Sequence, residues 1–200
     1  ETGNLELVKQ MSYVIQDLAL GEWIQADAKE NRNYTREIIE NIALKKTASV
    51  MSWCCYAAAI DQKLPENIIQ YAKELGSHLG LAFQLMDDSL DFSGASKKDY
   101  QLDLKNGMLN SVVYEWLELN PDKMNAFKSG EDIYVLVGDN NLSEAVSIIQ
   151  KNAHVHLRKC KEILILLQQE LPLSITSLTS HKNSIKPLNL IIDYMGGRKF

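Results

Sequence analysis

Apolar residues recur at three- and four-residue spacing along most of this sequence, and residues that interrupt helices are scarce. The 200 residues include 10 glycines and 4 prolines. Because an α-helix turns once in about 3.6 residues, this spacing places the apolar side chains on one face of each helix. The pattern predicts an all-α chain, and a hydrophobic content of 46% over this length suits one domain with a sizeable core.

The expected helices lie between the polar stretches. Pro65 pre-sets the backbone of a first helical turn, so we expect one helix to run from there to about Phe92. A short helix from Met108 should stop before Pro121. We also expect an N-terminal helix with its apolar stripe at Leu5, Val8, Met11, Ile15 and Leu18, and a long helix after the polar segment 27–33. Further helices are expected over 142–152, 155–171 and 187–195. Segment 133–137 could be either a helical turn or a strand.

Charge and composition exclude several classes of protein. A net charge of −5 argues against capture of nucleic acid, which needs clustered lysine and arginine. The cysteines, Cys54, Cys55 and Cys160, have neither disulfide-framework nor Cys-x-x-Cys spacing, which fits a reducing compartment. The longest apolar run, 163–167, is far shorter than the roughly 20 residues that span a bilayer, so no transmembrane segment is expected.

The four histidines do not indicate a second kind of active site. They lack the spacing of a zinc-binding helix and have no evident partners for a catalytic triad. We interpret them as surface or packing residues. They are His78, His154, His156 and His181.

Three acids stand in the otherwise apolar segment from Phe83 to Phe92. On a helix Asp91 lies one turn beyond both Asp87 and Asp88, so all three carboxylates can point into the same cleft. At about 5 Å and an effective dielectric near 20, each pair repels by roughly 3 kcal/mol, which a cation would relieve. Oxygen ligands of this kind suit Mg²⁺ that bridges carboxylates to substrate phosphates. The alternative is that the acids flank a helix end and face water.

Two basic segments could serve the same cleft. Lys45-Lys46-Thr47 precedes a run of small residues, and a lysine with a hydroxyl group is what a diphosphate needs once a metal has neutralised part of its charge. The polar, lysine-rich segment 93–106 directly follows the acidic helix and contains Lys98 and Lys105. Both segments could equally be solvated surface.

In order and spacing, these motifs resemble the trans-polyprenyl diphosphate synthases, in particular the long-chain enzymes that make quinone side chains. The resemblance extends over nearly the whole chain up to about Pro172. Its most specific part is the Phe-Gln-x-x-Asp-Asp-x-x-Asp run. The matching segments are Gly21-Glu22, Lys46-Thr47-Ala48-Ser49, the run from Gly80 to Phe92, Asp103-Leu104-Lys105 and Gly107.

The resemblance implies an antiparallel helical bundle of the isoprenoid synthase type, in which Mg²⁺ clamps an allylic prenyl diphosphate. Loss of the diphosphate leaves a carbocation that the double bond of isopentenyl diphosphate attacks. By resemblance, Asp87, Asp88 and Asp91 would hold metal, with Asp87 the direct ligand. The residues that would bind diphosphate are Lys46, Thr47 and Gln84, with Lys98 and Lys105 on the leaving group and Arg198 and Lys199 as a basic ending.

The family has two aspartate-rich motifs, and this sequence holds the second. We therefore expect residues 1–200 to be the C-terminal part of a synthase-like domain, incomplete without an N-terminal half. Such a chain would be a prenyltransferase that acts with a complementing chain in a homo- or hetero-oligomer. The alternative is a non-catalytic subunit for assembly or regulation of a larger complex. Met108, Asn110 and Ser111 depart from the small or Thr/Pro-like residues of the family's leaving-group loop. The intact Asp87-Asp88-x-x-Asp91 motif, together with Lys46 and Gln84, favours the enzyme.

The resemblance to enzymes of quinone side-chain synthesis implies a mitochondrial location, with the plastid and the cytoplasm as the other options. In this family, the residues that limit the cavity and set the product length are expected near the first motif.

Overall fold

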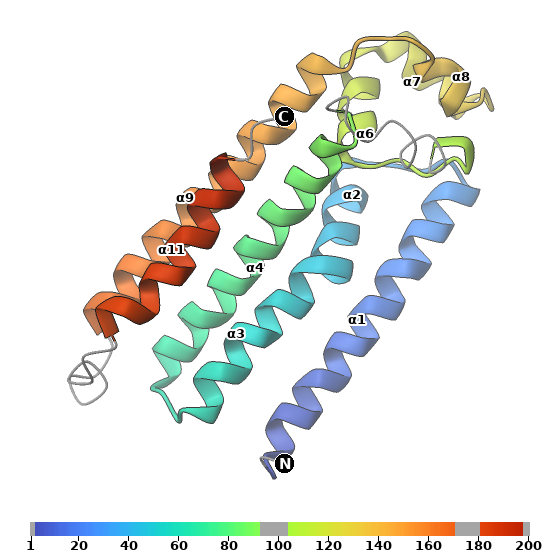
Figure 1. Ribbon diagram of the computed structural model, residues 1–200. Coiled ribbons are helices and arrows are strands. Elements are labelled where there is room, and N and C mark those ends of the chain that lie inside the picture. Colours follow the sequence, from blue (N-terminus) through green and yellow to red (C-terminus); the bar gives the residue numbers. More distant parts are fainter. Residues whose placement is uncertain (1–2, 93–103, 171–180, 198–200) are drawn as a thin grey trace.

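The computed structural model describes residues 3–92, 104–170 and 181–197, and these residues form helices and no strand (Figure 1). The predicted all-α class is confirmed. No helix within these ranges combines the length and apolar character that crossing a bilayer requires. The helices are α1 (Leu5–Glu30), α2 (Arg36–Ala43), the π-helical turn η1 (Leu44–Ala48), α3 (Ser49–Asp61), α4 (Glu66–Leu90), α6 (Ser111–Leu119), α7 (Pro121–Lys128), α8 (Ile133–Val137), α9 (Ser143–Glu170) and α11 (His181–Gly197).

Helix α4 is the central element of the bundle. It packs against α3 on one side and α9 on the other, while α11 lies against α9 and α1 lies beside α2, η1 and α3 (Figure 1). Pro65 precedes the first residue of α4, and Glu66 places a negative charge in the first turn, where the helix dipole favours it. The predicted boundaries of this helix are therefore confirmed. Asp91 occupies its C-cap position.

Glycines on α4 bring its backbone into contact with the preceding helices. A Cβ atom on Gly80 would lie 2.5 Å from the Cα atom of Ala48, and one on Gly76 would lie 2.4 Å from the carbonyl oxygen of Met51. Real Cβ atoms do not approach backbone so closely, so only glycine fits at these positions. This contact sets α4 directly against η1, which brings Thr47 beside Gln84.

Two clusters of buried side chains form the core. One lies around α6, α7 and α8 and includes Trp116, Leu117, Phe127 and Ile133. The other joins α4, α9 and α11 through residues such as Leu164. Each cluster covers one part of α9, so this helix connects the two halves of the core.

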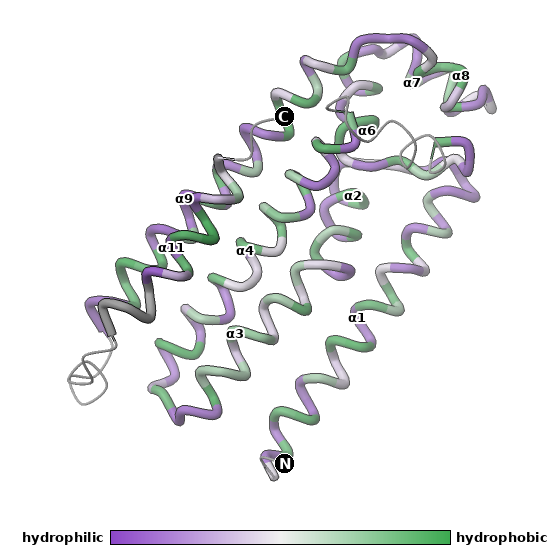
Figure 2. Tube along the Cα trace, in the orientation of Figure 1, coloured by the Kyte–Doolittle hydropathy of each residue, from purple (hydrophilic) through white to green (hydrophobic). Residues whose placement is uncertain are grey.

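The inward face of α1 differs from the predicted one. Its buried residues are Val14, Gly21 and Ala28, seven positions apart. Apolar residues also recur along the rest of this helix (Figure 2), but most of the predicted stripe is exposed. Small residues face inward because α1 closely approaches η1, and a Cβ atom on Gly21 would lie 2.7 Å from Cγ of Lys46. The exposed large apolar residues of α1 are Leu5, Val8, Met11, Tyr13, Ile15, Leu20 and Trp23.

Other boundaries also differ from those predicted. Helix α9 is continuous, whereas the polar residues around Asn152 predicted two helices; Ala153 is fully buried there and no glycine or proline interrupts the chain. The ambiguous segment 133–137 is helix α8. Helix α7 follows α6 at once, with Pro121 in its first turn. Helix α11 begins at His181 rather than near Pro187.

Candidate functional site

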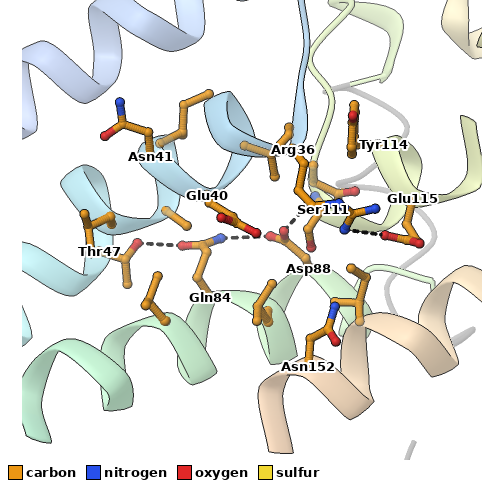
Figure 3. A pocket seen from close by; sticks show the side chains of 18 of the residues that line it. Arg36, Glu40, Asn41, Thr47, Gln84, Asp88, Ser111, Tyr114, Glu115 and Asn152 are labelled. Atoms are coloured by element: carbon orange, nitrogen blue, oxygen red, sulfur yellow. Dashed lines mark hydrogen bonds and ion pairs between the residues drawn. The ribbon is translucent and has the colours of Figure 1, made fainter. Parts of the chain in front are cut away.

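A cavity of about 830 Å³ opens between α2, α4, α6 and α9 (Figure 3). Its apolar lining includes Ile39, Leu81, Leu85 and Ile149. Polar side chains from separate helices face it as well. They include Gln25, Arg36, Glu37, Glu40, Asn41, Lys46, Thr47, Gln84, Asp88, Glu115, Asn152 and His156.

A chain of hydrogen bonds crosses the wall of this cavity (Figure 3). The Thr47 hydroxyl donates to Oε1 of Gln84 at 2.6 Å. Nε2 of Gln84 donates to Oδ1 of Asp88 at 2.8 Å. The backbone N–H of Ser111 donates to Oδ2 of Asp88 at 2.9 Å. Together these bonds tie η1, α4 and α6 into one polar unit.

Asp88 is 8% exposed, and each of its carboxylate oxygens accepts a hydrogen bond. Burial raises the pKa of this carboxyl, an effect that hydrogen bonds from Ser111 and Gln84 oppose. Ser111 is the first residue of α6, where backbone N–H groups lack partners within the helix. Asp88 therefore satisfies the N-terminus of α6 from the neighbouring helix α4.

The three acids of the motif lie in three different surroundings, whereas the sequence predicted one shared cleft. Asp88 lines the large cavity, Asp91 lines a second cavity of about 50 Å³, and Asp87 is exposed. Successive residues on a helix point about 100° apart, so Asp87 and Asp88 face different neighbours. In the part of the chain that the structure describes, no three acidic, histidine or cysteine side chains are grouped to hold a metal ion. The metal role stays a prediction.

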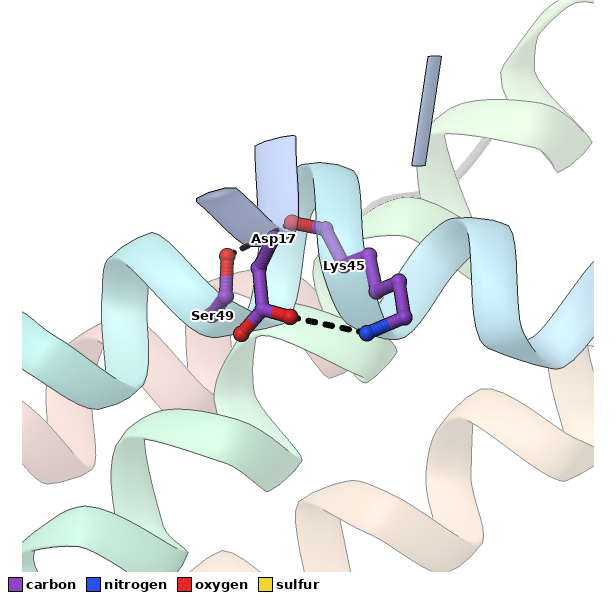
Figure 4. Close-up of polar contacts among 3 residues, drawn as sticks. All are labelled: Asp17, Lys45 and Ser49. Atoms are coloured by element: carbon purple, nitrogen blue, oxygen red, sulfur yellow. Dashed lines mark hydrogen bonds and ion pairs between the residues drawn. The ribbon is translucent and has the colours of Figure 1, made fainter. Parts of the chain in front are cut away.

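The two lysines of η1 are held by α1. Nζ of Lys46 lies 2.8 Å from Oε1 of Glu22 and donates to Oε1 of Gln25 at 2.6 Å. Nζ of Lys45 lies 2.7 Å from Oδ1 of Asp17 (Figure 4). Of the two lysines, Lys46 lines the large cavity. A π-helical turn often marks a functional position, and this one places Lys46 and Thr47 beside α4.

The remaining predicted residues lie away from this group or outside the described ranges. Lys105 is exposed, with Nζ 5.0 Å from the centroid of the Tyr134 ring. This contact is a cation–π interaction, so the structure places its charge against α8. Lys98, Arg198 and Lys199 lie outside the described residues.

The structure adds an ion pair that the sequence analysis missed. Nη1 of Arg36 lies 2.9 Å from Oε2 of Glu115, and its guanidinium lies 5.8 Å from the centroid of the Tyr114 ring. Glu115 is 6% exposed although it is charged. The only sequence signal was an acid within the apolar helix from Met108, which resembles the signal at Asp88.

Replacing Arg36 with methionine should lower the free energy of unfolding by about 1–3 kcal/mol, because it leaves the buried Glu115 carboxylate without its partner. Denaturation with urea at neutral pH measures this change. Lys159→Met is the matched control, since its partner Glu162 is exposed and such pairs contribute about 0–1 kcal/mol. Equal losses in the two variants would contradict the role given to the Arg36–Glu115 pair.

With this geometry established, comparison with known proteins identifies the family. The family model described as polyprenyl synthetase matches residues 1–135. An all-trans-polyprenyl-diphosphate synthase of Mus musculus is 30% identical over 174 residues, covering 80% of this chain and 42% of the relative. A prenyl transferase of Synechocystis is 30% identical over 202 residues, covering 98% of this chain and 59% of the relative. The chain therefore belongs to the polyprenyl synthetase family.

Solved structures share the fold. A decaprenyl diphosphate synthase from Rhodobacter capsulatus matches all of this chain and 61% of its own, with a TM-score of 0.76 and 21% identity. A polyprenyl synthase from Caulobacter crescentus, complexed with calcium and isoprenyl diphosphate, matches 100% of this chain and 61% of its own, with a TM-score of 0.77 and 19% identity. These likenesses confirm the predicted isoprenoid synthase type of helical bundle. The chain spans 42% of the length of the mouse relative.

Proposed function

We propose that this chain forms part of a trans-polyprenyl diphosphate synthase, which elongates an allylic prenyl diphosphate with isopentenyl diphosphate in a Mg²⁺-dependent reaction. The observation that carries the proposal is the meeting of Lys46 and Thr47 with Gln84 at one cavity, one helical turn from the acidic motif. Membership of the polyprenyl synthetase family supports it.

The hydrogen bonds decide which groups can receive a diphosphate. An ammonium group has three N–H donors, and Lys46 directs two of them to Glu22 and Gln25, which leaves one for a phosphate oxygen. An ionised Asp88 accepts only, so it fixes the amide of Gln84 with Nε2 toward itself and leaves the second N–H of Gln84 available. Thr47 donates its proton to Gln84 and so orients this amide. Lys46 and Gln84 are therefore the donors toward diphosphate.

Of the three acids, Asp87 suits the metal best. Asp88 is buried and each of its oxygens accepts a hydrogen bond, whereas Asp87 is exposed. Mg²⁺ keeps several waters and needs only one or two carboxylates beside substrate phosphates. When bound, such an ion stabilises the negative charge that develops on the departing diphosphate. The protein's own part is to orient the diphosphate through Lys46 and Gln84.

The chain would act with a segment that carries the first aspartate motif, whether that segment belongs to the same chain or to another. These 200 residues hold one such motif and span under half of the mouse relative. The exposed apolar residues of α1 are available for contact with such a segment, on the same chain or on another. We also propose that the active assembly is a homo- or hetero-oligomer. We further propose a mitochondrial location, because a rice relative is named as a mitochondrial solanesyl-diphosphate synthase. The plastid is the alternative, because an Arabidopsis relative is named as chloroplastic.

A second candidate is a non-catalytic subunit that serves assembly or regulation. This candidate is favoured because groups that could bind a ligand instead make contacts with other residues of the chain. Asp88 satisfies Ser111 and Gln84, and Lys46 is paired with Glu22. These contacts require neither metal nor substrate.

Incorporation of labelled isopentenyl diphosphate into prenyl product separates the two candidates. The assay contains Mg²⁺ and a short allylic diphosphate, and it compares the chain alone with the assembly purified from its source. Activity in the assembly alone supports a heteromeric synthase. Absence of activity in both supports the non-catalytic subunit.

A further inference from the structure

Two histidines join α4 to α9 near the large cavity. The Nδ1 atoms of His78 and His156 lie 2.9 Å apart, while the ring centroids are 5.2 Å apart and the planes are inclined by 40°. The rings therefore meet through their nitrogen edges rather than by stacking. We propose that His78 and His156 form a shared-proton site that fastens α4 to α9 and opens when both rings become cationic.

The short distance requires one proton between the two nitrogens, because two lone pairs or two N–H groups would repel. In the neutral pair, one ring donates from Nδ1 and the other carries its proton on Nε2. One added proton goes to the free Nε2 of the donor ring, which keeps the hydrogen bond and makes it charge-assisted. A second added proton has to occupy the accepting Nδ1. That step removes the bond and leaves two cations in contact.

The surroundings oppose positive charge on the pair. Burial lowers the pKa of His78, and Lys159 lowers it further, whereas Glu74 and Glu162 raise it. Burial also lowers the pKa of His156, with a further contribution from His78. Glu74 belongs to α4, and Lys159 and Glu162 belong to α9. Among the described residues of α2, η1, α3, α6 and α11, which also pack on these helices, no charged group shifts the pKa of either ring.

The site is connected to the large cavity. The cavity is lined by His156, Asn152 and Val155 of α9. It is also lined by Gln84 and Asp88 of α4. Separation of α4 from α9 at the histidine pair would therefore widen the space beside the polar unit. This inference concerns the fold of the chain and does not depend on the proposed function.

The sign of the pH dependence follows from the lowered pKa values. The unfolded chain binds protons at the ordinary histidine pKa of about 6.5, whereas the folded pair binds them at lower pH. The stability from the pair is thus fully present above pH 6.5 and is lost as the pH falls toward the folded pKa values. Between pH 7.5 and 5.0, we expect the melting temperature of the wild-type chain to fall by about 2–4 °C more than that of His78→Phe.

His154→Phe is the matched control. His154 is exposed on the same helix, and its ring contacts the carbonyls of Gln150 and Gly196 instead of another imidazole. This variant keeps the His78–His156 pair, so its melting temperature should still fall by more than that of His78→Phe between pH 7.5 and 5.0. Equal pH dependence in the wild type and His78→Phe would overturn the proposal.

A second measurement uses the wild-type chain alone, in case His78→Phe does not fold. Nitrogen-15 spectra of the imidazoles report the position of each proton during a pH titration. We expect opposite tautomers for His78 and His156 at neutral pH and two coupled titration steps. Independent titration of both rings at about pH 6.5 would overturn the shared-proton site.

Discussion

Replacing Asp87 with alanine should abolish Mg²⁺-dependent turnover in the assembled protein while leaving the helix content unchanged. Asp87 is exposed on α4, so its removal creates no cavity and leaves no buried partner unsatisfied. Loss of one group that stabilises transition-state charge costs about a hundredfold or more in rate. Incorporation of labelled isopentenyl diphosphate measures turnover, and circular dichroism measures helix content.

Two further variants serve as comparisons for Asp87→Ala. Asp139→Ala removes an exposed carboxylate from the connection between α8 and α9 and should leave turnover unchanged. In Asp87→Asn, residual turnover should require a higher Mg²⁺ concentration, because the side chain keeps its size and loses its charge. Unchanged turnover in Asp87→Ala would rule out the metal role of this residue. It would not affect the role of Lys46 and Gln84.

The identity of the acidic motif could be predicted from sequence, but its geometry could not. Helical spacing placed three acids on one helix within a turn of each other. It could not show that Asp88 is buried, because its second partner, the N–H of Ser111, lies 23 residues further along the chain. In the sequence, Ser111 stands out only as a departure from the family pattern. In the structure it anchors α6 to the motif.

The same distinction holds for the fold. Local signals such as Pro65 and a long apolar stripe predicted α4 correctly. The predicted inward face of α1 was wrong, because apolar residues occur around this helix and only packing against α2, η1 and α3 selects Val14, Gly21 and Ala28. The predicted break in α9 was wrong for a related reason. Burial of Ala153 in the core overrides the polar residues beside it.

Replacing Gly80 with valine should produce the largest loss of stability, about 3 kcal/mol, at the upper end of the range for overpacked cores. Its Cβ atom would lie 2.5 Å from Cα of Ala48 and 3.0 Å from Cβ of the same residue. Backbone cannot move aside as a flexible side chain can, so α4 and η1 would have to separate. Urea denaturation measures the loss, and Thr47 would move away from Gln84.

Gly197→Val is the control for this change, because a Cβ atom at Gly197 meets no other atom within 4 Å. It should alter the free energy of unfolding by less than about 0.5 kcal/mol. Gly80→Ala should lie between the two variants, since alanine adds the clashing Cβ atom alone and improves helix propensity by about 1 kcal/mol. If Gly80→Val were as stable as the wild type, the close contact between α4 and η1 would be wrong, and with it the placement of Thr47 against Gln84.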